Sequence, residues 1–209
     1  MDVPGFDPSV ARCWWSSASS ERADPAMVRY HDEEWGVPCH DDRELFERLA
    51  LESFQAGLSW STILHKREAF RDAFRGFDPV LVAAFDDADR ARLMADAGIV
   101  RNRAKIEATI GNAAAWLATA REFGSVDGYF ATQVPGPPMP LDANAQAGSI
   151  PARTEVSDRL SADLRRRGFR FVGSTIVYAF MQSVGLVDDH LPGCFRYAGS
   201  AGRERAARS

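Results

Sequence analysis

The sequence contains few cysteines and few lysines, and both shortages narrow the possible classes of protein. Three cysteines, Cys13, Cys39 and Cys194, stand among 209 residues, so the chain is not a small secreted scaffold held together by disulfides. Only two of its 25 basic residues are lysines, Lys66 and Lys105, and neither has a sequence setting that favours Schiff-base chemistry. The other bases are arginines, which together with abundant alanine indicates a GC-rich bacterial genome.

Long hydrophobic runs are also missing. No apolar run approaches the roughly 18–20 residues that a membrane-spanning helix needs. The N-terminal stretch MDVPGFDPSV lacks the basic flank and apolar core of an export signal. We therefore expect a cytoplasmic protein without a membrane partner, and the hydrophobic content of 45% is ordinary for a globular chain.

A large excess of charge of either sign is likewise absent. The formal net charge is −4, which argues against a protein that coats nucleic acid. Bases nevertheless cluster in RNRAK at 101–105 and in RRRGFR at 165–170. Two such clusters fit one positive face that holds phosphates, although any one cluster taken alone is more typical of a solvated helix face.

The sequence shows helical periodicity with recurrent capping residues, and no segment has the pattern of a strand. We therefore predict an all-α fold. The first expected helices cover 43–55, after an N-cap at Asp41 or Asp42, and about 59–74. A short helix is expected from Asp78-Pro79, a further one from Asp86 to near Gly98, and a long one over 102–123. A short helix around Tyr129 and two more, over 154–168 and 173–184, complete the set. We expect disorder in 1–11 and in 198–209, a long Pro- and Gly-rich loop at 134–153, and one domain over 12–197.

Glu52 is a lone acid in an otherwise uncharged run, LESFQAGLSW at 51–60. On a helix over 43–55 it falls on the same inward-facing stripe as Leu45 and Leu49. A buried carboxylate without a partner is costly, so the position predicts either a partner or a function. Tyr30, with His31 and Trp35 close by in sequence, suggests a pocket for a flat, electron-poor ring. The alternative is that Glu52 accepts hydrogen bonds from the backbone of a neighbouring helix start.

Four potential metal ligands lie at the two ends of the chain. Cys13 and His31 are near the N-terminus, and His190 and Cys194 are near the C-terminus with three residues between them. A Cys₂His₂ set is typical of closed, structural zinc. The alternative treats the four as buried core residues. Cys39 and His40 could compete as ligands, although adjacent residues do not easily bind one ion.

The segment DAGIVRNRAK at 96–105 predicts a tight turn between two helices. A helix ends, Gly98 turns the chain, and a second helix begins within a few residues. Backbone N–H groups at a helix N-terminus, with Arg101, Arg103 and Lys105 beside them, can bind an anion. Most such joints bind nothing, so the turn alone is a weak signal.

Taken together, these motifs resemble the DNA-3-methyladenine glycosylase I family, a zinc-bearing branch of the helix–hairpin–helix glycosylases. The resemblance runs from about Arg12 to Tyr197. It is carried by RCWW at 12–15, YHDEEWGVP at 30–38, LESFQAGLSW at 51–60, DAGIVRNRAKIEATIGNA at 96–113, RGFRFVGSTIVYAFMQSVGLVDDH at 167–190 and GC at 193–194.

The resemblance implies a helix–hairpin–helix fold whose N- and C-terminal segments are joined by one structural Zn²⁺. Its ligands would be Cys13, His31, His190 and Cys194. We expect a zinc-linked part of 12–40 plus 154–197 and a helical part of 41–133. The hairpin at 96–105 would hold the DNA backbone through Gly98, Val100, Arg101, Arg103 and Lys105.

The implied activity is monofunctional excision of 3-methyladenine from double-stranded alkylated DNA, by a monomer that flips the damaged base into an aromatic pocket. Glu52 would recognise the base and assist catalysis, Tyr30 and Trp60 would form the pocket, and Trp15 and Trp35 would lie nearby.

Two departures from the family pattern stand out: Ser53 replaces the glycine that commonly follows the acid, and YFATQV at 129–134 replaces a Leu-Trp-Ser-Phe-Val-like stretch. The second puts the packing beneath the long loop in doubt. The rival interpretations are a non-catalytic zinc-stabilised DNA-binding protein and a zinc hydrolase with Glu52 as general base.

Overall fold

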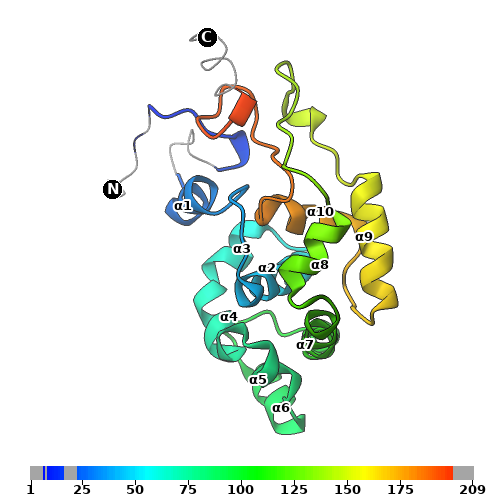
Figure 1. Ribbon diagram of the computed structural model, residues 1–209. Coiled ribbons are helices and arrows are strands. Elements are labelled where there is room, and N and C mark those ends of the chain that lie inside the picture. The colour runs from blue at the N-terminus through cyan, green and yellow to red at the C-terminus, as the bar shows by residue number, and fades with distance from the viewer. Residues whose placement is uncertain (1–6, 8, 17–22, 200–209) are drawn as a thin grey trace. The chain divides into compact units, whose positions relative to one another are not determined.

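The computed structural model describes residues 7, 9–16 and 23–199, and its regular elements are helical (Figure 1). Within that part of the chain no β-sheet forms, and the only extended pairing is an isolated bridge between Pro140 and Asp188. The all-α prediction is therefore confirmed. The elements run in the order η1 Trp14–Ser16, α1 Pro25–Glu33, α2 Asp42–Gln55, α3 Trp60–His65, α4 Arg67–Ala73, η2 Arg75–Phe77, α5 Pro79–Ala83, α6 Asp87–Ala95, α7 Arg103–Phe123, α8 Val126–Gln133, η3 Ala147–Ser149, α9 Glu155–Arg166 and α10 Ser174–Ser183.

Side-chain caps explain where these helices begin. Asp41, Ser59, Asp78, Asp86 and Asn102, which lie at the starts of expected helices, each accept hydrogen bonds from backbone N–H groups in the first turn. The Asp-Pro signal recurs at α1, a helix that the sequence analysis did not delimit. There the Asp24 carboxylate accepts from the N–H of Ala26 at 3.0 Å, and Pro25 occupies the first helical position.

The helix expected over 59–74 is instead two helices, α3 and α4, with a break at Lys66. The N–H of Lys66 bonds back to the carbonyls of Ile63 and Leu64, and its ψ of 0° departs from helical geometry. Its ammonium group donates to the carbonyl oxygens of Ala97 and Gly98, at 3.2 and 3.0 Å. Side-chain periodicity does not reveal this contact, which explains why the sequence predicted one helix.

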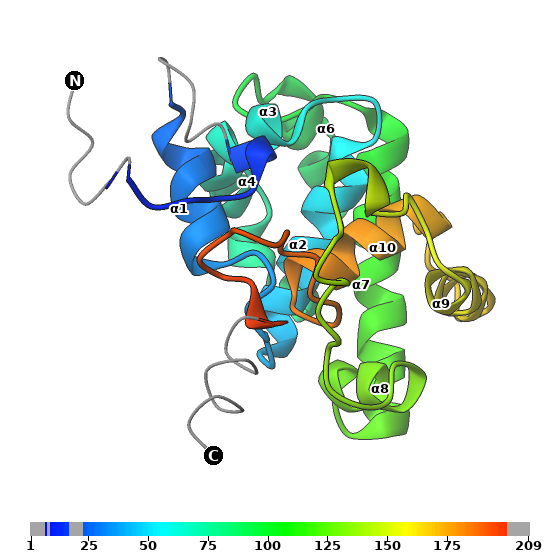
Figure 2. The same cartoon turned by 90° about the horizontal axis from the view of Figure 1, so that it is seen from above.

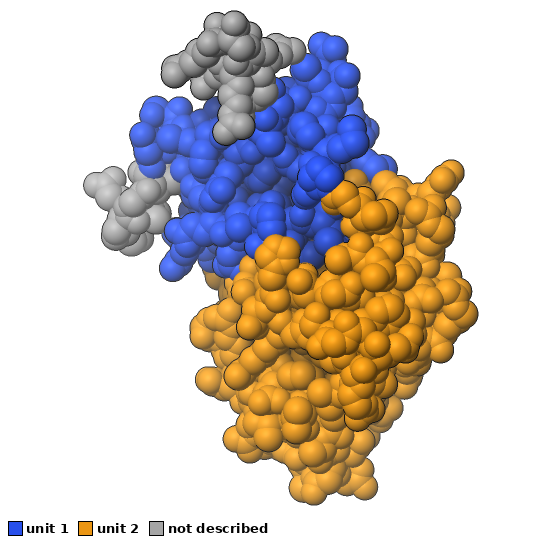
Figure 3. Space-filling model, in the orientation of Figure 1, with its two compact units in different colours: residues 1–38, 137–152, 181–209 blue, residues 39–136, 153–180 orange. Residues whose placement is uncertain are grey.

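The chain divides into two compact units, coloured separately in Figure 3. Unit 1 comprises residues 1–38, 137–152 and 181–209, and unit 2 comprises residues 39–136 and 153–180. This division differs from the expected one, which placed 154–180 with the chain ends and set the long loop apart. The predicted disorder at 1–6, 8 and 200–209 concerns residues outside those that the structure describes.

Aromatic side chains dominate the core of unit 2. The fully buried rings come from α2, α4, η2, α7, α8, α10 and the joint between α4 and η2, and they are Phe46, Phe54, Phe70, Phe74, Phe77, Trp116, Tyr129, Phe130 and Phe180. Burial of each such side chain contributes about 1.5–3 kcal/mol relative to exposure. α8 folds back beside the end of α7 (Figure 2), and Tyr129 and Phe130 of the atypical YFATQV stretch are both buried. The departure in that stretch therefore retains aromatic packing.

Local contacts explain why α9 belongs to unit 2 and the long loop to unit 1. α9 belongs to unit 2 because the Tyr129 hydroxyl donates to Asp163 at 2.7 Å and the Ser161 hydroxyl donates to the Val172 carbonyl at 2.6 Å. The loop belongs to unit 1, where the Tyr197 hydroxyl donates to the Leu141 carbonyl at 2.7 Å. No helix in the described ranges has both the length and the apolar character to cross a membrane.

Candidate functional site

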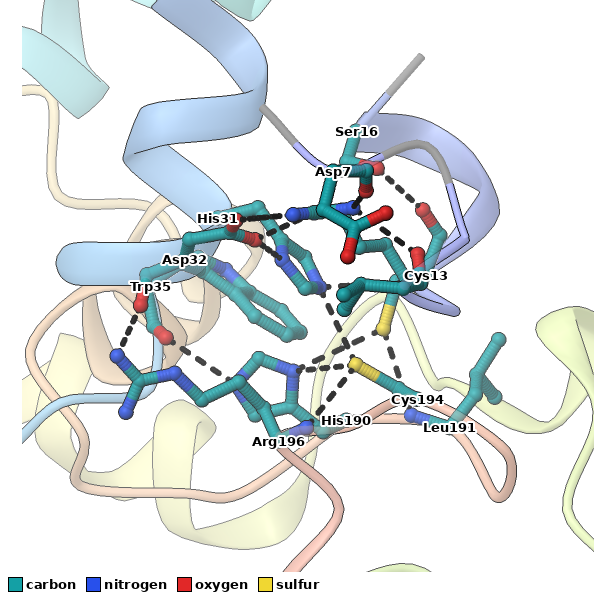
Figure 4. A network of polar contacts seen from close by, with 12 residues as sticks. Asp7, Cys13, Ser16, His31, Asp32, Trp35, His190, Leu191, Cys194 and Arg196 are labelled. Atoms are coloured by element: carbon teal, nitrogen blue, oxygen red, sulfur yellow. Dashed lines mark hydrogen bonds and ion pairs between the residues drawn. The ribbon is translucent and has the colours of Figure 1, made fainter. Parts of the chain in front are cut away.

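Four buried side chains from three segments of unit 1 converge on one point, as Figure 4 shows. Cys13 precedes η1, His31 lies in α1, and His190 and Cys194 follow α10. Their ligand atoms all lie within 4.8 Å of one another. The structure thus brings together all four residues that the sequence named.

The separations match a tetrahedral metal site. Zn–S bonds of about 2.3 Å and Zn–N bonds of about 2.05 Å place neighbouring S and N ligands about 3.6 Å apart. The Cys194 Sγ lies 3.4 Å from His31 Nε2 and 3.6 Å from His190 Nδ1, and the Cys13 Sγ lies 3.7 Å from His190 Nδ1. The donor set and its spacing therefore fit zinc.

Hydrogen bonds on the far side of each imidazole set which nitrogen faces the centre. The Asp32 carboxylate lies 2.8 Å from His31 Nδ1, so that nitrogen carries the proton and Nε2 is free to bind a metal. The Trp35 carbonyl lies 3.2 Å from His190 Nε2, which leaves Nδ1 as the ligand atom. Asp32 is itself held by the Arg12 guanidinium at 2.7 Å. The sequence analysis missed Arg12 and Asp32, whose only signal is adjacency to Cys13 and His31.

The environment of Cys194 favours the thiolate that a metal requires. A hydrogen bond from the Cys13 thiol lowers the pKa of the Cys194 thiol against the opposing effect of burial. The backbone N–H of Arg196 points at the same sulfur at 3.5 Å. This thiol therefore ionises more easily than an ordinary cysteine.

Three aromatic residues expected near the base lie around this centre in unit 1. The Trp15 ring centroid is 4.9 Å from that of Trp35 and 6.1 Å from that of Tyr30. Trp35 also meets His190 edge-on at 4.7 Å. Tyr30 and Trp35 are buried, whereas Trp15 is partly exposed. The metal ligands thus share their packing with Trp15, Tyr30 and Trp35.

Glu52 lies on α2 in unit 2 and faces inward, as the helical stripe predicted. It is 4% exposed, and burial raises the pKa of its carboxyl to about 8, although Arg48 acts to lower it. No hydrogen bond to this carboxyl forms among the residues that the structure describes, so the helix-start alternative has no support there. A carboxyl with this affinity for a proton can hold either a proton or a cationic partner near neutral pH.

The buried carboxyl of Glu52 is expected to make stability fall as pH rises. Between pH 4.5, the ordinary value, and about 8, the folded chain holds a proton on Glu52 that the unfolded chain has lost. The free energy of unfolding should therefore decrease by up to about 1.4 kcal/mol per pH unit in that window. Urea unfolding across the window should show this slope in the wild type and a smaller slope in Glu52→Gln, which stays neutral. Equal slopes in both proteins would contradict the assignment.

Trp60 begins α3, two residues after the exposed Leu58, and its indole is half-buried. The Ser59 hydroxyl caps this helix by accepting from the N–H of Thr62 at 3.2 Å. Ser53, next to Glu52, shares its single hydroxyl proton between the carbonyls of Leu49 and Phe171, at 2.9 and 3.0 Å. The serine that departs from the family pattern therefore ties α2 to the turn before α10.

A turn joins α6 to α7 within the segment 96–105, where the sequence predicted one. Gly98 N–H donates to Asp96 at 2.7 Å, and the Asn102 side chain caps α7 by accepting from the N–H of Lys105 at 3.1 Å. Arg101 and Arg103 are exposed beside the turn.

The side chain of Lys105 does not extend beside the turn as the sequence analysis expected. Its ammonium is buried and donates to the carbonyls of Phe54 and Ala56, at 2.9 and 2.6 Å. The physical reason is that these carbonyls end α2 without helical partners. Lys105 therefore fixes the end of α2 against the hairpin, and only its backbone N–H belongs to the turn.

Comparisons with known proteins match nearly the whole chain to one family of glycosylases. A family model described as methyladenine glycosylase matches residues 19–197. DNA-3-methyladenine glycosylase 1 of Escherichia coli (strain K12) is 48% identical over 191 residues, which cover 91% of this chain and 99% of that protein. DNA-3-methyladenine glycosylase of Haemophilus influenzae is 45% identical over 185 residues, covering 88% and 97%.

Solved structures give the same result. A crystal structure of 3-methyladenine DNA glycosylase I superposes with a TM-score of 0.82 at 47% identity, covering 90% of this chain and all of that one (100%). The glycosylase I of Staphylococcus aureus, whose structure concerns 3-methyladenine recognition, superposes with a TM-score of 0.82 at 37% identity, covering 88% and 97%.

Proposed function

This chain belongs to the methyladenine glycosylase family, and we propose that it removes 3-methyladenine from alkylated DNA in base excision repair. The observation that carries the proposal is the buried carboxyl of Glu52, inside a chain that matches these glycosylases along almost their full length. Such a carboxyl suits a cationic, flat ligand that is not part of the protein chain.

Excision of 3-methyladenine depends on selective binding of the base more than on strong acid–base catalysis. Methylation at N3 leaves the adenine positively charged, so the base is already a good leaving group. Water attacks the sugar carbon, the bond from that carbon to the base nitrogen breaks with its electrons going to the base, and the water loses a proton. Neutral 3-methyladenine and an abasic site result. The base must first leave the stack, and a weakened base pair lowers the cost of extrusion.

We assign the recognition of the base to Glu52 and to aromatic rings. Glu52 would accept hydrogen bonds from the adenine edge and complement its charge. The indole of Trp60 would stack on the base, which is worth about 1–3 kcal/mol and gains a cation–π contribution. Tyr30, Trp15 and Trp35 are proposed as further aromatic contacts.

The lysines support a monofunctional enzyme. The ammonium group of Lys66 donates to two carbonyls at the hairpin, and that of Lys105 donates to two carbonyls at the end of α2. Neither amine is therefore free to attack a sugar carbon. The hairpin would bind the backbone of duplex DNA through the N–H groups near Gly98 and Val100 and through Arg101 and Arg103, and we propose that the enzyme acts as a monomer.

We further propose that Cys13, His31, His190 and Cys194 hold one structural Zn²⁺. Zinc at this site would supply no chemistry beyond cross-linking the segments of unit 1. Four protein ligands leave no open coordination position, which argues against a zinc hydrolase.

Chromatography of the bases released from methylated duplex DNA tests the proposed activity. Purified protein is expected to release free 3-methyladenine and to leave unbroken abasic DNA strands. DNA binding without base release would instead favour the non-catalytic DNA-binding protein, and strand cleavage at the abasic site would contradict the monofunctional assignment.

A further inference from the structure

The only two lysines of the chain, Lys66 and Lys105, both join the hairpin segment 96–105 to the segment 52–66. Segment 52–66, here called the recognition segment, carries Glu52 near the end of α2 and Trp60 at the start of α3. Both segments belong to unit 2. Excision requires DNA at the hairpin and the flipped base at Glu52 and Trp60 at the same time, so the contacts between the two segments bear on the reaction.

Lys66 reaches from the recognition segment to the hairpin. Its ammonium group stands at the break between α3 and α4 and donates to the carbonyl oxygens of Ala97 and Gly98, at 3.2 and 3.0 Å. A Cβ added at Gly98 would lie 3.0 Å from the Cβ of Ala69, so α4 packs directly against this turn. The first half of the hairpin is therefore held against the joint of α3 and α4.

Lys105 reaches in the opposite direction, from the first turn of α7 to the recognition segment. Its ammonium group donates to the carbonyl oxygens of Phe54 and Ala56, at 2.9 and 2.6 Å, and the residue is 7% exposed. These two carbonyls lie between Glu52 and Trp60 in the sequence. The second half of the hairpin is therefore held against the stretch that connects the two recognition residues.

Both contacts fix main chain rather than side chains. Neither ammonium group forms an ion pair with a carboxylate among the residues that the structure describes. An ammonium group carries three donors and no acceptor, and each of these two spends donors on a pair of backbone carbonyls. Since the acceptors are backbone atoms, the two lysines set the position of one main-chain segment against the other.

We propose that Lys66 and Lys105 are positioning residues for base excision. They hold the hairpin and the recognition segment in one register, so that DNA bound at the hairpin presents its flipped base to Glu52 and Trp60. A displacement of about 1 Å between reacting groups can cost about 100-fold in rate. Neither lysine touches the base in this arrangement. The inference rests on the proposed function, since it takes excision of 3-methyladenine as the reaction that the two lysines serve.

The variant Lys66→Met tests the inference, because methionine keeps an unbranched stem and removes the donors. Lys66 is only partly buried, so its replacement disturbs packing less than replacement of the buried Lys105. Single-turnover release of 3-methyladenine from methylated duplex, at saturating enzyme, should fall by about 10- to 100-fold. The affinity for free 3-methyladenine without DNA should stay at the wild-type value, because Glu52 and Trp60 are intact. Lys105→Met should show the same division between the two measurements.

Two further variants serve as controls. Lys66→Arg restores the positive charge and the N–H donors, so it should recover most of the lost rate. Arg121→Met removes an exposed cation from the last turn of α7 and should release base at the wild-type rate.

Three results would overturn the positioning role. The first is a wild-type rate at saturating enzyme in Lys66→Met, whether or not its affinity for DNA is lower. The second is an equal loss of affinity for free 3-methyladenine, which would show that Lys66 merely supports the pocket. The third is an equal loss of rate in Arg121→Met. In each case base release by the wild type leaves the proposed function standing, whereas no release by the wild type rejects that function and the inference with it.

Discussion

Replacing Glu52 with glutamine is expected to lower kcat/KM for 3-methyladenine release by about 100-fold, the usual cost of losing one preorganised electrostatic contact in a water-poor site. Glutamine keeps the size of the side chain but cannot carry a negative charge. The wild-type value should also rise with pH up to about 8, where the carboxyl ionises. Glu52→Gln should lose this dependence, since its side chain does not titrate. Single-turnover base release over the pH range measures both effects.

The matched control for Glu52→Gln is Glu33→Gln. Glu33 is exposed at the end of α1, so the same change in chemistry should leave base release at the wild-type rate. Activity of Glu52→Gln within a factor of about two of the wild type would exclude the recognition role. A partner variant, Trp60→Ala, should lower base release by about 10- to 100-fold through lost stacking, whereas Trp14→Ala removes an indole that is 66% exposed and should not.

Removal of the zinc that we propose at Cys13, His31, His190 and Cys194 is expected to unfold unit 1. Structural zinc supplies about 10 kcal/mol or more in small zinc domains, which is comparable to the entire stability of a typical protein. Chelation, or Cys194→Ser, should therefore abolish the fixed packing of Trp15 and Trp35 and reduce the near-UV circular dichroism. Unit 2 has its own aromatic core, so helical far-UV signal should persist to a larger degree.

Cys39→Ser serves as the control for metal binding. Cys39 is a free cysteine of unit 2 and is not one of the four converging residues. Elemental analysis should find one zinc per chain in the wild type and in this control, and less in Cys194→Ser. Zinc-free wild-type protein with an undiminished melting temperature would contradict a structural metal.

Much of the helical architecture could be predicted because its signals are local. Asp41, Asp78 and Asn102 cap helices through side chains that reach N–H groups two or three residues away, and Gly124 ends α7 with a positive φ. The inward position of Glu52 followed from counting along one helix. Contacts between distant segments produce no comparable pattern in the sequence. The break at Lys66 and the inward turn of Lys105 both depend on carbonyls more than 30 residues away in sequence.

By itself the sequence determined that the chain is helical, that Glu52 is buried, and which family its motifs resemble, because spacing and residue type along one helix carry that information. Only the tertiary structure decided that the four Cys and His ligand atoms meet at metal-binding distances and that Asp32 and Trp35 orient the imidazoles. The physical reason is that hydrogen bonds and ion pairs act over a few ångströms in space, and only folding sets which distant residues come that close.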